Sequence, residues 1–108
     1  MPTLEEDIRE SICIILSTAK GERVTQPDFG CELHNLVFQT IDTATLDRVE
    51  RIVREALTSH EPRIEVVNVN AAVDEGIEGR LLINIMYRIL STNYLYETVY
   101  PLYLTEGI

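Results

Sequence analysis

The spacing of apolar residues changes once along this chain, at Pro62, and this change constrains the fold more than any other feature of the sequence. Before Pro62, apolar residues recur at the spacing of amphipathic helices. After it, residues alternate with a period of two, which is typical of half-buried strands. A helical half followed by a stranded half predicts an α+β domain, because alternating strands and helices would be needed for a parallel sheet.

The first predicted helix is marked at both ends. Thr3 followed by Glu6 offers a capping box, and Gly21 suits the position just past the helix end. The apolar residues of this helix share one stripe and are Leu4, Ile8, Ile12, Ile15, Leu16 and Ala19. Ile14 falls outside the stripe, which indicates a second buried surface, either within the domain or against a partner.

The second predicted helix begins after Asp42 or Thr43, either of which can cap it, and runs to about Ser59. Its predicted core face consists of Leu46, Val49, Ile52, Val53, Ala56 and Leu57. The opposite face carries i,i+4 ion pairs with the acid first, such as Asp47 with Arg51, which are more typical of a solvated helix than of a binding site.

Three strands complete the predicted fold. They are expected over residues 64–73, 80–90 and 97–105, with a glycine-bearing turn at 74–79 and a break at 91–94. Between the two helices, residues 27–38 are expected to form a turn and a short helical segment with inward Leu33, Leu36, Val37 and Phe38. The prediction is a single domain, residues 1–108, with two to three N-terminal helices packed on one face of a three-stranded antiparallel sheet.

Composition excludes several classes of function. Eighteen acidic and nine basic residues give a net charge of −9, which argues against binding a phosphate backbone. Cys13 and Cys31 are widely spaced and lack a second pair, so the sequence supports neither a zinc site nor a disulfide framework, and reduced cytosolic thiols are favoured. The longest apolar run, Ile12 to Leu16, is too short to span a bilayer, and no export or membrane signal is visible.

No established catalytic motif is present, and no cofactor is expected. The sequence contains no Gly-rich phosphate loop, nucleophile elbow or zinc-protease motif, and its two histidines lack ligand-like spacing. The conceivable acids of a glycosidase are Glu22, Asp28 and Glu61. Arginines close to Glu22 and Glu61 would lower their pKa values and make them poor general acids.

Two rigid, charged corners stand out from these elements. Residues 21–30 combine acids and bases with Gly21, Pro27 and Gly30, and residues 61–63 read Glu-Pro-Arg. Such corners are either ordinary turns or contact points for a partner. Arg63 can bind a carboxylate through two parallel hydrogen bonds, and Glu61 is expected to orient it. An ion pair within the chain, of Glu61 with Arg23 or of Arg63 with Glu22, is the competing interpretation, and the two are compatible.

These motifs, in this order, resemble the baseplate wedge family of contractile phage tails, type VI secretion systems and related contractile injection systems. The resemblance, sometimes called tail-lysozyme-like, is specific from about Ile8 to Val69 and looser beyond. The segments that carry it are Ile-Leu-Ser-Thr-Ala-Lys, Gly-Glu-Arg, Pro-Asp-Phe-Gly-Cys-Glu-Leu and Glu-Pro-Arg. It implies a structural, non-enzymatic subunit that is cytoplasmic and assembles into a baseplate, contractile tail or injection particle.

The resemblance also implies two partners. Glu61, Pro62 and Arg63, with Glu22 and Arg23 beside them, would anchor the chain to a helical core bundle formed by the larger wedge proteins. The sheet would seed sheath assembly by accepting a strand of the sheath protein. The expected contact residues in the third strand are Tyr100, Leu102 and Leu104. Neither nucleic acid nor a membrane is an expected partner.

Two other classes of function remain open, and so does the choice of sheet edge. A tail-associated lysozyme, which is a peptidoglycan glycosidase, is the alternative, and a small regulatory binding domain is a third class. Both outer strands would leave one row of backbone groups unpaired. Pro101, Glu97 and Glu106 could instead protect the edge of the third strand against aggregation.

Overall fold

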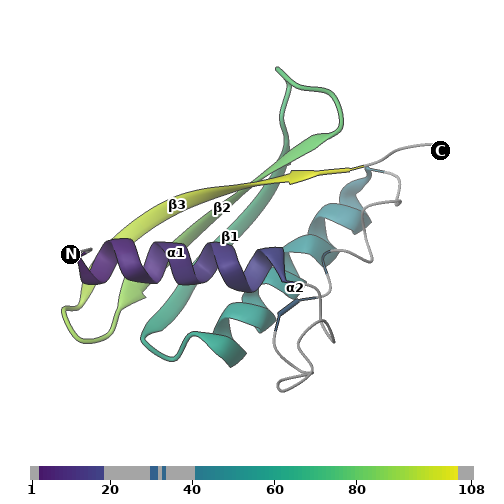
Figure 1. The fold of residues 1–108 in the computed structure, drawn as a ribbon. Coiled ribbons are helices and arrows are strands. Elements are labelled where there is room, and N and C mark those ends of the chain that lie inside the picture. Colours follow the sequence, from purple (N-terminus) through teal and green to yellow (C-terminus); the bar gives the residue numbers. More distant parts are fainter. Residues whose placement is uncertain (1–2, 19–29, 32, 34–40, 105–108) are drawn as a thin grey trace.

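The described part of the protein folds into two helices followed by a three-stranded antiparallel sheet (Figure 1). The structure is a computed structural model that describes residues 3–18, 30–31, 33 and 41–104. In order, its elements are α1 (Leu4–Ser17), α2 (Thr43–His60), β1 (Ile64–Val73), β2 (Arg80–Ile89) and β3 (Tyr94–Tyr103). The α+β class and the sheet are confirmed. The described residues contain two helices, and most of the predicted segment 27–38 lies outside them.

The start and the buried stripe of α1 follow the sequence prediction closely. Thr3 Oγ1 accepts a hydrogen bond of 3.1 Å from the Glu6 amide, which is half of the predicted capping box. Ile8, Ile12, Ile15 and Leu16 are buried as predicted. Leu4 is 41% exposed, so its assignment to the stripe was wrong: it is the first residue of the helix and extends beyond the core. Ile14 is 43% exposed, so this domain leaves its side chain available to solvent.

Asp42 caps α2 by accepting a hydrogen bond of 2.8 Å from the Thr45 amide. This bond lowers the pKa of the Asp42 carboxyl. The helix ends at His60, one residue after the predicted end. Most of its predicted core face is buried against the sheet, with Leu46 and Ile52 partly exposed at the margin.

One face of the sheet is covered by the helices and the other is open. Along β2 the inward positions Leu81, Ile83, Ile85, Tyr87 and Ile89 are all buried, and the residues between them are partly exposed. Strand order is β1-β2-β3, with Ile89 opposite both Ile64 and Tyr94. The hairpin that joins β1 to β2 projects beyond the helices at the top of Figure 1. This arrangement explains the period of two seen in the sequence.

The boundaries of β3 differ from the prediction. The strand begins at Tyr94, not Glu97, and ends at Tyr103, not Thr105. The turn before it is tighter than expected because Asn93 adopts a positive φ of 65° and its amide donates to the Ile89 carbonyl at 2.7 Å. Asparagine tolerates this conformation better than most residues, so the chain can reverse within four positions.

A close backbone approach ties the end of α1 to the segment that follows it. Gly30 has a φ of 106°, and a Cβ at this position would lie 2.4 Å from the Thr18 carbonyl oxygen. The next amide, that of Cys31, donates to the same oxygen at 3.0 Å. Cys31 and Leu33 are buried, and for Leu33 this confirms the predicted inward orientation. Glycine is therefore required at position 30 for two reasons, the positive φ and the lack of space for a Cβ.

Candidate functional site

The Glu-Pro-Arg segment forms the corner between α2 and β1. Glu61 is the C-cap of α2, where its amide still donates to the Leu57 carbonyl at 2.9 Å. Its φ of −128° and ψ of 82° leave the helical region, as expected for a residue that precedes proline. Pro62 then turns the chain, and the Arg63 carbonyl accepts a hydrogen bond of 3.0 Å from the Leu90 amide. The corner is thus hydrogen-bonded to the residue that follows β2, at the end of the β1–β2 pair opposite the hairpin.

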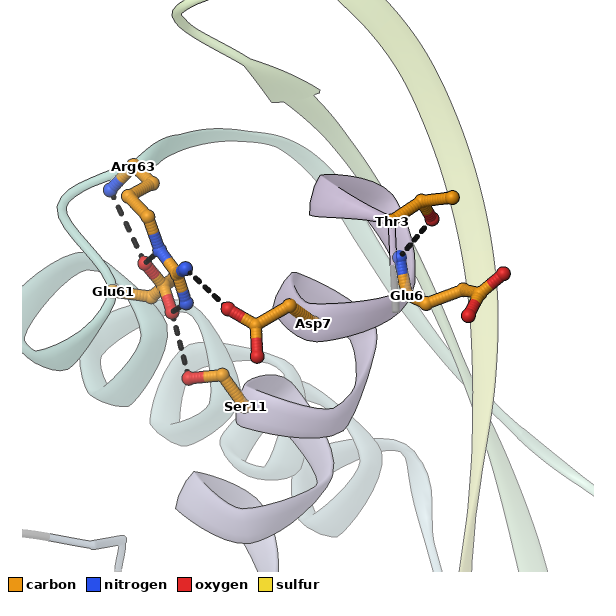
Figure 2. A network of polar contacts seen from close by, with 6 residues as sticks. All are labelled: Thr3, Glu6, Asp7, Ser11, Glu61 and Arg63. Atoms are coloured by element: carbon orange, nitrogen blue, oxygen red, sulfur yellow. Dashed lines mark hydrogen bonds and ion pairs between the residues drawn. The ribbon is translucent and has the colours of Figure 1, made fainter. Parts of the chain in front are cut away.

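Glu61 and Arg63 form a two-pronged ion pair across this corner (Figure 2). Arg63 Nε donates to Glu61 Oε1 at 2.7 Å, and Arg63 Nη2 donates to Oε2 at 2.8 Å. The Arg63 amide also donates to Oε1, at 3.2 Å. Parallel hydrogen bonds of this kind fix the plane of the guanidinium as well as its position. The predicted role of Glu61 in orienting Arg63 agrees with this geometry.

Helix α1 supplies two further partners, both visible in Figure 2. Ser11 Oγ donates to Glu61 Oε2 at 2.7 Å, and Arg63 Nη1 donates to Asp7 Oδ2 at 2.8 Å. Asp7 and Ser11 are four positions apart and therefore lie on the same side of the helix. The network joins the first helix to the corner, although the sequence offered no sign of this pairing.

Burial divides the network into a buried anion and an accessible cation. The side chain of Glu61 is 3% exposed, whereas that of Arg63 is 41% exposed and that of Asp7 is 55% exposed. The hydrogen bonds from Arg63 hold the pKa of Glu61 below its usual value, and the same bonds raise the pKa of Arg63. Each terminal nitrogen of the guanidinium retains a second N–H that these contacts do not use. Arg63 is thus a rigidly held cation with donors left for another acceptor.

This geometry does not suit Glu61 to acid catalysis. A glycosidase requires one protonated carboxyl group with a raised pKa next to an ionised partner. Glu61 has the opposite shift, is buried, and has both oxygens occupied. The other candidates, Glu22 and Asp28, lie outside the described residues, as does Arg23.

A hollow of about 130 Å³ lies between α2 and the 30–31 segment. It is lined by Gly30, Cys31, Ile52, Glu55, Ala56, Ser59 and His60. Among these residues Glu55 is the single carboxylate, whereas glycoside hydrolysis needs two across a sugar cleft. The described lining therefore does not provide the pair of acids that this chemistry requires.

The predicted partner residues in and just after β3 point into the domain. Leu102 and Leu104 belong to the core, with 9% and 8% of their surface exposed. Tyr100 is partly buried, and its hydroxyl lies 3.0 Å from Ser17 Oγ on α1. Their neighbours Val99 and Tyr103 are 49% and 60% exposed. The sequence analysis did not identify Val99 and Tyr103 as candidate contact residues. Strand alternation was a signal that could have found them, because it places both on the opposite sheet face from Leu102.

The described ranges contain neither a metal site nor a membrane-spanning helix. No group of histidine, cysteine and carboxylate side chains in residues 3–18, 30–31, 33 and 41–104 could hold a metal ion. Over the same residues, neither helix is long and apolar enough to cross a bilayer.

Comparison with known proteins assigns this architecture. A sequence profile described as "Baseplate wedge protein gp25" matches residues 2–94. The Baseplate wedge protein gp25 of enterobacteria phage T4 is 40% identical over 63 residues, which are 58% of this chain and 48% of the phage protein. The chain therefore matches about half the length of that relative.

Solved structures agree with the sequence comparison. A Geobacter sulfurreducens protein provisionally called a tail lysozyme is 55% identical, with a TM-score of 0.91 over 100% of this chain and 97% of that one. A chain of a type VI secretion baseplate complex is 18% identical, with a TM-score of 0.75 over 92% of both chains. A chain of the contracted R2 pyocin baseplate is 21% identical, with a TM-score of 0.61 over 97% and 89%. The last two similarities concern the fold alone.

Proposed function

Because this chain belongs to the gp25 baseplate wedge family, we propose that it is a structural wedge subunit that anchors to larger wedge proteins and seeds the sheath. The observation that carries the anchoring role is the state of Arg63. It is fixed in plane by Glu61, keeps unused N–H donors, and is 41% exposed at a corner between two elements. A cation prepared in this way binds a partner carboxylate with little further ordering.

The partner for this corner is a helical core bundle formed by larger wedge proteins. Helix surfaces in bundles present carboxylates in fixed positions, which suit recognition by a planar guanidinium. Pro62 restricts the backbone next to Arg63, so the side chain leaves the corner in one direction. Glu22 and Arg23 are proposed to flank this contact.

The second part of the proposal concerns the sheath. An outer strand of the sheet accepts a strand of the sheath protein, which extends the sheet across the two proteins. The outer edge of β3 supports this role, because no strand of the described domain pairs with it. The subunit would be synthesised in the cytoplasm and would assemble into the baseplate there.

The anchoring role is tested by co-purification with the larger wedge proteins. Arg63→Ala should abolish the complex, because loss of a charged contact at a desolvated interface costs about 2–5 kcal/mol. Arg63→Lys should rescue it only weakly, since lysine lacks the planar fork. Arg88→Ala is a matched control: Arg88 is 34% exposed and pairs with Glu65 at 2.7 Å on the open sheet face. Unchanged co-purification of Arg63→Ala would remove the anchor role.

A tail-associated lysozyme is the alternative function. The provisional label of the Geobacter sulfurreducens structure is its main support, and a label of this kind does not identify a site. The lowered pKa of Glu61 opposes it. A structural role accounts for the same residue without catalysis.

A further inference from the structure

The two outer strands of the sheet differ in how their free edges are occupied. On β1, the register identifies the outward groups. The Asp74 amide donates to the Arg80 carbonyl at 2.9 Å, so the even-numbered residues of β2 turn their backbone groups toward β1. Their partners on β1 include Asn70 and Ala72. The intervening residues Val69, Ala71 and Val73 therefore direct their N–H and C=O groups away from the sheet.

Side chains of α2 occupy part of this β1 edge. Glu50 Oε2 accepts a hydrogen bond of 2.8 Å from the outward amide of Ala71. Arg54 Nη1 donates at 3.3 Å to the carbonyl of Val66, which is outward because the register shift between Val66 and Asn68 reverses the alternation before it. Since an incoming strand would need these same backbone groups, it would have to displace both side chains. Helix α2 thus closes the edge of the strand on which it packs.

The edge of β3 is open by the same criterion. The Leu104 amide donates to the Gly79 carbonyl at 2.6 Å, so even-numbered residues face β2. The outward residues are Leu95, Glu97, Val99, Pro101 and Tyr103. Pro101 lacks an N–H, and at an outward position it removes no ladder bond. Among the described residues, no side chain or backbone group forms a hydrogen bond with an outward backbone group of this strand.

We propose that strand addition takes place at β3 alone, because Glu50 and Arg54 close the β1 edge. This inference rests on the proposed sheath-seeding function and assigns it a surface. It also defines the incoming strand. Leu95, Val99 and Tyr103 are 52%, 49% and 60% exposed, so the strand carries apolar side chains beside them. Glu97 lies among them without an ion pair in the described domain, so a lysine or arginine faces it.

Residue-resolved hydrogen exchange of the full chain, with and without the sheath protein of the same machine, tests this proposal. The outward amides of Glu97, Val99 and Tyr103 should exchange at least about tenfold more slowly when sheath protein is present. Those of Val69 and Val73 should keep their free-state rates. Protection of β1 with β3 unchanged would overturn the choice of edge while leaving strand addition intact. Protection of neither strand would overturn the proposed sheath-seeding function, and the inference with it.

A pair of proline variants provides a second measurement. Val99→Pro removes an outward N–H donor from β3, and Val73→Pro removes one from β1. The two positions are matched in burial, because Val99 is 49% exposed and Val73 is 47% exposed. Sheath binding should weaken about tenfold for Val99→Pro and stay within about twofold for Val73→Pro. Melting curves of both variants confirm that each remains folded. Weakening by Val73→Pro alone would contradict the proposal, and the exchange experiment decides the matter if either variant fails to fold.

Discussion

Asp7 and Arg63 are 56 positions apart in the sequence, yet Arg63 Nη1 donates to Asp7 Oδ2 at 2.8 Å. This contact and the neighbouring bond from Ser11 to Glu61 connect α1 to the corner between α2 and β1. The proposed anchor is therefore also part of the internal structure of the domain. Arg63 can take part in the internal ion pair and also contact a partner, because its guanidinium retains N–H donors that the internal contacts do not use.

The energetic weight of the network should lie with its buried member. Asp7→Asn should lower the free energy of unfolding by less than about 1 kcal/mol, since both partners in that pair are exposed. Arg63→Ala should lower it by about 1–3 kcal/mol, because the buried carboxylate of Glu61 loses two charged hydrogen bonds. Urea unfolding of the free protein measures both. Equal losses of unfolding free energy for the two variants would show that burial of Glu61 does not increase the contribution of its hydrogen bonds to stability.

Glu61 should make the domain sensitive to acid. Its pKa is lowered in the folded state, so its contribution to stability is complete above the unfolded value of about 4.3 and is lost as the pH falls through the folded value. The free energy of unfolding should therefore decrease below about pH 4. Glu61→Gln should show a shallower decrease in urea unfolding over the same pH series. Parallel curves for the two proteins would contradict the assignment.

Gly30 should tolerate no side chain. Gly30→Ala places a Cβ against the Thr18 carbonyl at a φ of 106°, and we expect a loss of more than about 1 kcal/mol of stability. Gly76→Ala is the control, because a Cβ there would meet only Asp74 Oδ1, at an ordinary 3.4 Å. Thermal unfolding distinguishes them. Similar melting temperatures would indicate that the segment near Gly30 shifts to make room.

Tyr87 should tolerate loss of its hydroxyl. Its ring stacks on Tyr96 with centroids 6.0 Å apart. Among the described residues its buried hydroxyl makes no hydrogen bond of good geometry, although Arg9 lies near enough to oppose part of the rise that burial causes in the pKa of Tyr87. Because a buried unpaired polar group is unfavourable, Tyr87→Phe should leave stability unchanged or raise it by up to about 1 kcal/mol. Chemical denaturation provides the measurement. A clear loss of stability would reveal a bond to this hydroxyl.

Muramidase activity should be absent. We expect the purified protein to release no reducing sugar from peptidoglycan under conditions in which a known lysozyme does so. Glu22→Gln, Asp28→Asn and Glu61→Gln test the three conceivable acids, and none should alter the baseline. Hydrolysis that disappeared with one of these substitutions would replace the structural function with the enzymatic one.

The sequence was most informative where local rules operate alone. Thr3 and Asp42 mark the helix starts by capping, and Pro62 marks the switch to strands, so β1 was predicted with its observed bounds. The start of β3 was missed because Asn93 supports a tighter turn than its neighbours suggested. Asp7 was missed because a pairing over 56 positions depends on how α1 packs, which no local pattern encodes.

The edges show a similar division. Alternation identifies which side chains of β3 face the core, but the choice of free edge depends on side chains from another element. Glu50 and Arg54 belong to the charged face of the second helix, which the sequence pattern indicates to be solvated. Their bonds to β1 emerge only when the helix is placed against the sheet. Sequence pattern alone does not distinguish such residues from ordinary surface charges.

The register shift in β1 determines which residues of this strand face the helices. The register shifts between Val66 and Asn68, so Val67 is an additional residue without a partner on β2. The even positions 64 and 66 before it, and the odd positions from Val69 onward, consequently face the helices. Loss or gain of one residue here would move every later side chain of β1 to the opposite face of the sheet, while the Arg63 corner stayed in place. Insertions and deletions in this strand should therefore be tolerated only in pairs of residues, because an even change keeps the same side chains on the face that the helices cover.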